Sequence, residues 1–199
     1  MPPRPIMTRK ISPTDMPAVA AIHKAAYLTD HFSAHFTNTL LENMYAELCR
    51  ENPFSLIATD SSGQVLGFVV GHFAEQVGRA RKNFVAANYL AIAAASLLHP
   101  LALLNKAKTR LRALFNRESS PSQARMRLTS IAVSPNSQKR AVGRALLDAF
   151  EDNLRQQGIF RYGLSVKGNN QPAVRFYQKN GFIEESRTPD GSIYYIKNL

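Results

Sequence analysis

Residues 127–150 read RLTSIAVSPNSQKRAVGRALLDAF, and this stretch decides the fold class. Its first seven residues alternate between polar and apolar side chains, which is typical of a half-buried strand. Pro135 ends the strand, and an amphipathic helix then runs through Leu146 and Phe150 to a stop at Gly158. A strand, a loop and a helix in this order form the first half of a βαβ unit.

The rest of the chain supplies further strands and helices in a mixed order. We expect strands over Met7–Ile11, Ser55–Thr59, Val65–Phe73, Tyr162–Val166, Phe182–Arg187 and Ser192–Lys197, and helices after Ser12, over Phe36–Arg50 and over about 170–179. Tyr162–Val166 is the expected parallel partner of the strand at 127–133. The pattern predicts the α/β class with a mixed sheet, in a single domain spanning 1–199.

Composition and charge restrict the protein class. The 199 residues include 45% hydrophobic and 20% charged residues, which excludes a wholly disordered or collagen-like chain. The single cysteine, Cys49, cannot form an internal disulfide, no cysteine and histidine set has zinc-site spacing, and no apolar signal run follows the N-terminus. A cytoplasmic, reducing location is therefore expected. The formal charge of +11 predicts attraction to a polyanion: nucleic acid, an anionic membrane face or a phosphorylated ligand.

Residues 75–120 differ in composition from the sequence around them and are expected to be an apolar and basic helical insertion. No charge occurs from 83 to 105, whereas eight Lys and Arg and no acid lie between Arg79 and Arg117 outside that run. Pro100 is expected to divide the run into two helices. We consider three interpretations: helices that pack on the domain, a lid or homodimer contact, or a hairpin at an anionic membrane surface through 79–117.

The loop at 138–143 is a candidate phosphate-binding site. Backbone N–H groups at a helix N-terminus carry partial positive charge and receive anions, and Ala141 and Gly143 would let a pyrophosphate approach. Lys139, Arg140 and Arg144 add full charges. The alternative is an ordinary solvated helix start. Basic residues oppose the helix dipole at that end, which favours an anionic ligand.

Two sequence blocks together resemble the GNAT superfamily of acetyl-CoA-dependent N-acetyltransferases. The first is Leu128–Pro135 followed by Gln138-x-x-Ala141-x-Gly143-Arg144, and the second is Asn170-x-x-Ala173-x-x-x-Tyr177-x-x-x-Gly181-Phe182. The resemblance implies a mostly antiparallel central sheet of six to seven strands flanked by helices, with the insertion between the third and fourth strands. It also implies that acetyl-CoA is the co-substrate. No metal is expected, because no cysteine and histidine set has zinc-site spacing.

The resemblance also implies which residues form the site. A bulge near Ile131–Val133 splays the fourth strand from the fifth, and Tyr177 is the general acid for the departing thiolate. The cofactor is held by Ile131, Ala132, Val133, Gln138, Lys139, Arg140, Ala141, Val142, Gly143, Arg144, Asn170 and Ala173. Without the resemblance, Tyr177 is read as part of a buried helix face. Ala141 stands where the family most often has Gly. An alanine methyl is tolerable there if φ is negative, so looser rather than absent cofactor binding is expected.

The preferred function is transfer of an acetyl group from acetyl-CoA to a primary amine, by direct attack in a ternary complex. The sequence identifies neither the acceptor nor the general base. His72, Glu75 and Ser130 are candidate bases, and each is also explained as a structural residue. The alternative is a non-catalytic acyl-CoA-binding or membrane-surface-associated regulatory domain. Nucleic-acid binding is disfavoured, because the basic residues surround an apolar run without interleaved aromatic stacking positions.

Overall fold

The computed structural model describes residues 5–27, 32–98, 122–138 and 140–199. Its strands are β1 (Met7–Lys10), β2 (Ser55–Thr59), β3 (Val65–Phe73), β4 (Met126–Val133), β5 (Arg161–Lys167), β6 (Ile183–Arg187) and β7 (Ser192–Asn198). Its helices are α1 (Met16–Ala26), α2 (Asn38–Cys49), α3 (Ala74–Ala87), α4 (Tyr89–Leu98), α6 (Val142–Gln156) and α7 (Gln171–Lys179). The expected strands over 55–59 and 65–73 have the expected bounds.

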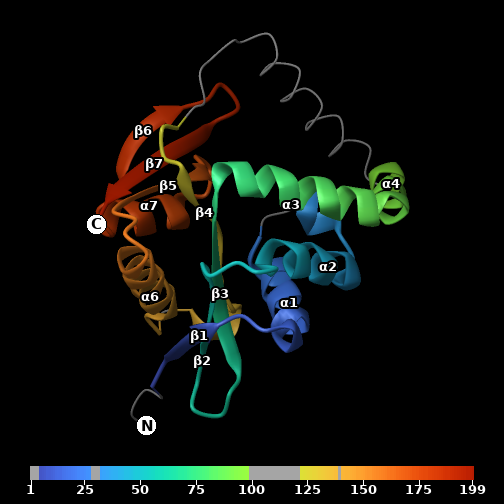
Figure 1. Cartoon of the computed structure of the whole chain (residues 1–199), viewed down its shortest axis with the longest axis horizontal. Coiled ribbons are helices and arrows are strands. Elements are labelled where there is room, and N and C mark those ends of the chain that lie inside the picture. Colours follow the sequence, from blue (N-terminus) through green and yellow to red (C-terminus); the bar gives the residue numbers. More distant parts are fainter. Residues whose placement is uncertain (1–4, 28–31, 99–121, 139) are drawn as a thin grey trace.

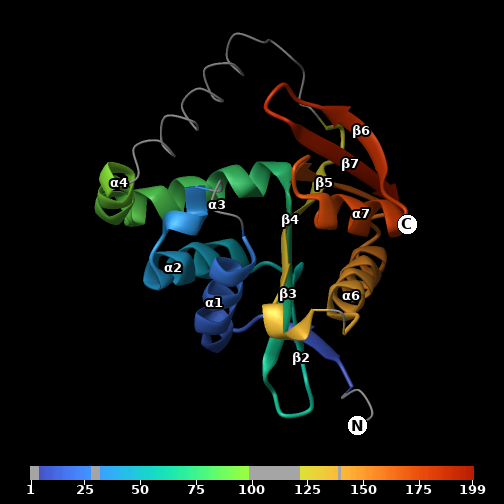
Figure 2. The same cartoon turned by 180° about the vertical axis from the view of Figure 1, so that it is seen from behind.

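The strands form one mixed sheet in the order β1-β2-β3-β4-β5-β7-β6. Every neighbouring pair is antiparallel except β4 and β5, which are parallel. Figure 1 shows the sheet nearly edge-on, with α6 and α7 on one side and α1, α2 and α3 on the other, and Figure 2 shows the same layers from behind. The predicted class, a mostly antiparallel sheet flanked by helices, is confirmed.

The sheet opens between β4 and β5. These strands share two residue pairs, Met126 with Tyr162 and Arg127 with Gly163, and are not paired beyond them. The divergence begins beside a bulge in β4: Val70 pairs with Ser130 but Gly71 pairs with Leu128, so Thr129 is the extra residue. The bulge was expected near Ile131–Val133 and lies just before that stretch. We call the diverging part of β4 and β5, from Thr129 to Val133 and from Leu164 to Lys167, the splay.

The bulge also changes which face of the sheet each β4 side chain occupies. Strict alternation would place Met126, Leu128, Ser130 and Ala132 on one face. Met126 and Leu128 belong to the apolar cluster under α6, whereas Ala132 belongs to the cluster under α1 and α2. The extra residue at Thr129 therefore moves Ser130 and Ala132 to the α1 and α2 face.

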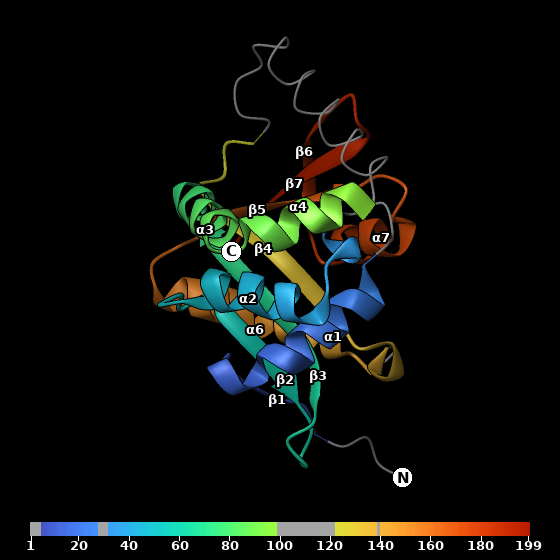
Figure 3. The same ribbon diagram turned by 90° about the vertical axis from the view of Figure 1, so that its right-hand side faces the viewer.

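The described part of the expected insertion is helical. The junction between α3 and α4 is at Asn88, whose backbone N–H donates to the Phe84 carbonyl, and it was not expected there. Pro100 and the rest of 99–121 lie outside the described residues. Val85, Tyr89 and Leu90 are exposed on these two helices, which Figure 3 shows above α1 and α2. Within the described ranges, no helix is both long and apolar enough to cross a bilayer.

Candidate active site

The N-terminus of α6 lies directly after the turn that follows β4. Ala141 is its N-cap, with φ +60° and ψ +11°, and no side chain caps the helix there. The first N–H groups of a helix have no partner within it, so this end presents free donors and positive dipole charge to an anion. The condition on which an alanine was expected to be tolerable here, a negative φ, is not met. The turn into the helix needs the left-handed conformation, which costs an alanine about 1–2 kcal/mol.

The side chains around this helix start differ in their availability. Gln138 and Ala141 are exposed, Arg140 is half-buried and Val142 is buried. A Cβ on Gly143 would lie 3.6 Å from the Phe176 ring and from Val133, so a methyl group fits there. Lys139 lies outside the described residues.

Arg144, expected to contact the cofactor, is held by the protein itself. Its Nε donates to Asp148 at 2.9 Å, and its Nη1 donates to the Asn180 side chain at the end of α7. The bond to Asp148 lies within α6, and the bond to Asn180 ties α6 to α7. Arg144 therefore has a structural role in addition to the cofactor contact that the sequence predicts.

The helix α7 begins on the other side of the splay. Asn170 is its N-cap, and the side-chain oxygen accepts from the backbone N–H of Ala173 at 3.3 Å. This bond fixes the orientation of the amide, whose nitrogen remains a donor. Ala173 is half-buried against the cluster under α6, so its contribution to a ligand site would be made by the backbone or the methyl group.

Tyr177 is buried in an aromatic group on α7. Its ring lies 5.3 Å from that of Phe182 and 5.5 Å from that of Phe176, centroid to centroid. Among the described residues its hydroxyl makes no side-chain hydrogen bond. Burial raises the pKa of Tyr177, and the nearby Tyr27 adds to the rise. The phenol is therefore protonated at neutral pH and is a proton donor. It belongs both to the core and to the splay region that Tyr27 approaches.

A hydrogen-bonded chain that sequence reasoning missed lies on the α1 and α2 face of β4. The Tyr27 hydroxyl bonds to the Ser130 hydroxyl at 2.5 Å, and Ser130 bonds to the Tyr45 hydroxyl at 3.0 Å. His23 Nδ1 bonds to the Tyr45 hydroxyl at 2.7 Å, and His23 Nε2 bonds to the Ser33 hydroxyl at 3.1 Å. The Ile131 backbone also hydrogen bonds to Tyr27. Ser130 was a candidate base, but its partners lie 85 and 103 positions away in the chain, too far for any local signal.

The other candidate bases are engaged elsewhere. His72 is buried, with Nε2 at 2.7 Å from the Leu48 carbonyl and Nδ1 at 3.1 Å from the Thr129 hydroxyl. Burial lowers the pKa of His72, which keeps the ring neutral. These bonds connect the end of α2 to the bulge residue, so His72 positions the bulge. Glu75 is exposed and forms a 3.4 Å ion pair with Arg125.

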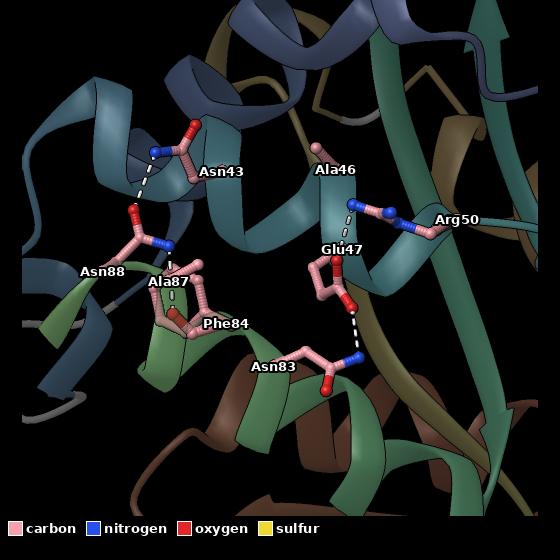
Figure 4. A pocket seen from close by; sticks show the side chains of 8 residues that line it. All are labelled: Asn43, Ala46, Glu47, Arg50, Asn83, Phe84, Ala87 and Asn88. Atoms are coloured by element: carbon pink, nitrogen blue, oxygen red, sulfur yellow. Dashed lines mark hydrogen bonds and ion pairs between the residues drawn. The ribbon is translucent and has the colours of Figure 1, made fainter.

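A polar pocket of about 270 Å³ lies between α2 and α3, away from the splay (Figure 4). Its polar groups bond to one another. Asn43 donates to the side-chain oxygen of Asn88, and Glu47 accepts from Asn83 and pairs with Arg50. Because these groups are already satisfied, we interpret the pocket as the seam that joins α3 to α2.

Comparisons with known proteins match the region of the chain that contains the two GNAT-like sequence blocks. A model of the Acetyltransferase (GNAT) family matches residues 101–182. The chain is 39% identical over 57 residues to the ribosomal protein bS18-alanine N-acetyltransferase of Escherichia coli (strain K12). That match covers 29% of this chain and 38% of the relative, so the chain spans well under half the length of the curated relatives it matches first.

Solved structures show the same fold over nearly the whole chain. The structure of SsHAT superposes with a TM-score of 0.67 at 21% identity, covering 97% of this chain and 98% of that one. The PaiA N-acetyltransferase of Thermoplasma acidophilum, solved in complex with coenzyme A, gives a TM-score of 0.57 at 15% identity, covering 98% and 99%. The splayed mixed sheet is the fold of these structures, and this fold together with the family model supports membership of the GNAT superfamily of acetyltransferases.

Proposed function

We propose that this protein is an N-acetyltransferase that moves an acetyl group from acetyl-CoA to a primary amine, by direct attack in a ternary complex. The observation that carries the proposal is the convergence of three elements: the uncapped start of α6, the splay and Tyr177 on α7. The catalytic unit is one domain over 1–199, with 75–120 as an insertion. The single free cysteine, Cys49, suits a cytoplasmic location, and burial raises the pKa of its thiol to about 11, so it is not a nucleophile at neutral pH.

We assign each predicted site residue a role in cofactor binding or in proton transfer. The amides that begin α6 receive the pyrophosphate, with Gln138 and Arg140 beside it. For Lys139, outside the described residues, the same role is proposed from the sequence alone. The backbone of 131–133 and the Asn170 amide hold the pantetheine arm in the splay. Tyr177 donates its proton to the departing thiolate. An oxyanion that forms on the thioester carbonyl needs an N–H donor, and the backbone of 132–133 in the splay is the candidate source.

Calorimetric titration with acetyl-CoA tests the cofactor site. We expect Gly143→Glu to abolish binding, because its carboxylate would face the pyrophosphate. Gly143→Ala is the matched control and should bind, since a Cβ at this position meets its neighbours at ordinary contact distances. Equal binding by all three proteins would place the cofactor elsewhere. Absence of binding by the folded wild type would refute the proposal.

The acceptor is sought with an amine panel. The E. coli relative is named as an alanine N-acetyltransferase, which makes a peptide α-amine the first class to try. The panel is an alanine-initiated tetrapeptide amide, Nα-acetyl-lysine amide, spermidine and glucosamine 1-phosphate. Acetylation is followed by mass spectrometry of the acceptor. A wild type that binds acetyl-CoA and acetylates none of these amines would favour the alternative, a non-catalytic acyl-CoA-binding regulatory domain.

A second proposal concerns the surface of 79–117. We infer that this segment contacts an anionic membrane surface, which would place the enzyme near membrane-made acceptors. Tyr89 and Leu90 are 63% and 69% exposed on α4, and the basic residues Arg79, Arg81 and Lys82 precede them on α3. This arrangement combines apolar insertion with charge attraction.

Sedimentation with vesicles tests the membrane contact. The wild type should sediment with vesicles that contain phosphatidylglycerol and not with pure phosphatidylcholine, and Leu90→Glu should reduce binding. Phe160→Glu removes an equally exposed apolar side chain outside this surface and is the control. A protein that ignores both vesicle types but is dimeric in light scattering would instead support a homodimer contact.

A further inference from the structure

The hydrogen-bonded chain that links Tyr27, Ser130, Tyr45, His23 and Ser33 is continuous, and it runs from the splay to the short 3-10 turn Phe32–His35. Ser130, Tyr45 and His23 are 8%, 1% and 2% exposed, whereas Tyr27 and Ser33 at the two ends are only partly buried. The three consecutive bonds between Tyr27 and His23 are 2.5, 3.0 and 2.7 Å long. A continuous buried polar path of this kind can pass a proton from one end to the other.

One assignment of hydrogens satisfies every link in the same direction. Tyr27 donates to Ser130, Ser130 donates to Tyr45, and Tyr45 donates to a neutral His23 through Nδ1. The remaining ring N–H, on Nε2, donates to Ser33. In this arrangement the oxygen of Tyr27 is left as an acceptor, and the Ile131 backbone N–H uses it in this structure.

The Tyr27 end of the chain is beside the reacting atoms of the proposed function. Tyr27 bonds to the backbone of Ile131 in the splay, and it is close enough to Tyr177 to raise the pKa of that phenol. An amine that attacks a thioester held between these two tyrosines would have the Tyr27 oxygen within reach of its N–H. The Tyr27 ring also stacks on the His23 ring with 4.0 Å between centroids, which holds the start of the chain in place.

We propose, on the basis of the function proposed above, that the hydrogen-bonded chain from Tyr27 to His23 is a proton relay for the acceptor amine, with His23 as the final proton acceptor. As the N–C bond forms and the C–S bond breaks, the amine proton passes to the oxygen of Tyr27. Each hydroxyl then hands its own proton one place along, and His23 becomes an imidazolium. Tyr177 protonates the thiolate. His23 releases its proton to solvent past Ser33, and Tyr177 regains one from solvent, so amine and thioester become amide and thiol.

The titratable groups in and around the hydrogen-bonded chain are compatible with proton transfer along it. Among the described residues, the titratable groups in or beside the hydrogen-bonded chain, apart from His23, are Tyr27 at the end of α1, Tyr45 and Cys49 from α2, and Tyr177 from α7. Burial raises the pKa of all four, so at neutral pH each is a neutral group. A neutral hydroxyl passes a proton by accepting one and donating another, whereas a permanent phenolate would trap it.

The test removes a hydroxyl from the middle of the hydrogen-bonded chain and leaves Tyr27 and His23 unchanged. Ser130→Ala and Tyr45→Phe are assayed for kcat/KM between pH 5.5 and 9, with acetyl-CoA and the four panel amines. The wild type should lose activity toward acid as an imidazole becomes charged, which for an ordinary histidine occurs near pH 6.5. We expect the rate of both variants to fall by about 10²-fold, which is the lower end of the usual contribution of a general base. We also expect both variants to lose the acid limb of the profile, which is the fall of kcat/KM toward acid pH.

Three controls separate the relay from a structural role. Ser130→Thr keeps the hydroxyl and should restore most of the rate together with the acid limb. Ser55→Ala, on β2, removes a buried hydroxyl that is not part of the hydrogen-bonded chain, and it should leave the pH profile of kcat/KM unchanged. Thermal melting and acetyl-CoA binding should be like wild type in Ser130→Ala and Tyr45→Phe.

The outcomes also separate this proposal from the proposed function. Wild-type rates and pH profiles in both chain-breaking variants would overturn the relay and leave the acetyltransferase intact. If both variants have reduced rates but keep the acid limb of the wild type, the hydrogen-bonded chain only supports the fold. This outcome would also overturn the relay. A wild type that binds acetyl-CoA but acetylates no amine would overturn the proposed function and the relay with it.

Discussion

At the scale of single residues, Ala141 carries backbone strain that a glycine would remove. Its φ of +60° costs an L-residue about 1–2 kcal/mol, whereas glycine gains flexibility in the unfolded chain worth roughly 0.4–1 kcal/mol. Ala141→Gly should therefore raise the free energy of unfolding by about 0.5–1 kcal/mol, measured in urea. Ala145→Gly, one turn into α6, is the control and should lower it by about 1 kcal/mol. A destabilised Ala141→Gly protein would mean that the turn does not need the left-handed conformation.

Tyr177 is the second residue whose role has a direct test. Tyr177→Phe keeps the ring contacts with Phe176 and Phe182 and removes only the hydroxyl. We expect acetyl-CoA binding and thermal stability close to wild type, and a rate lower by about 10²-fold, because general acid catalysis typically contributes at least that much. The measurement is kcat with the best panel amine. An unchanged kcat would remove Tyr177 from the mechanism and leave it as a core residue.

At the scale of elements, one ion pair joins β1 to the start of α1. Arg9 donates to both oxygens of Asp15 at 2.7 and 2.8 Å, and the Ser12 N–H and hydroxyl donate to the same carboxylate. These bonds, that from Arg9 first, lower the pKa of Asp15 to about 2. A lowered pKa stabilises the fold above the unfolded pKa of about 3.9, and this contribution is lost as the pH falls toward 2.

Urea unfolding at pH 7 and at pH 2.5 measures this contribution. Asp15→Asn should lower the free energy of unfolding by about 1–2 kcal/mol at pH 7, a range that allows for solvent screening of the half-exposed Arg9. The difference from wild type should shrink as the pH approaches 2. Asp152→Asn, in an exposed pair with Arg155, should change stability little at either pH. A difference that does not depend on pH would show that the Asp15 charge is not responsible.

At the scale of the whole molecule, the proposed cofactor contacts three elements from different parts of the sheet. A ligand that bridges β4, α6 and α7 stabilises the folded state only, so its saturation should raise the melting temperature. At 100 times its Kd the gain is about 2.7 kcal/mol, which corresponds to roughly 5–10 °C for a chain of this size. Differential scanning calorimetry with coenzyme A measures it. Gly143→Glu should show no shift, and an equal shift in that variant would contradict the α6 site.

Much of this molecule was predictable because the information is local. Periodicity placed the β2 and β3 strands with their observed bounds, and the stop at Gly158 marked the end of the α6 region. The candidate loop at 138–143 was found in the same way, from small and basic residues at the start of a helix. The Asn88 junction of α3 and α4 was missed, since Asn88 is fixed by Asn43 on α2, a contact that no local pattern reports.

The sequence by itself determined the element order, the mixed sheet and the resemblance to the GNAT superfamily, because periodicity, helix stops and motif spacing are properties of neighbouring residues. Only the tertiary structure decided where the bulge lies, that Ala141 is left-handed, and that Tyr27 meets Ser130 from 103 positions away. These features depend on how α1 and α2 fit against β4 after one extra residue has turned Ser130 toward them. Side-chain packing across the sheet sets that fit, and it has no signature in any short stretch of chain.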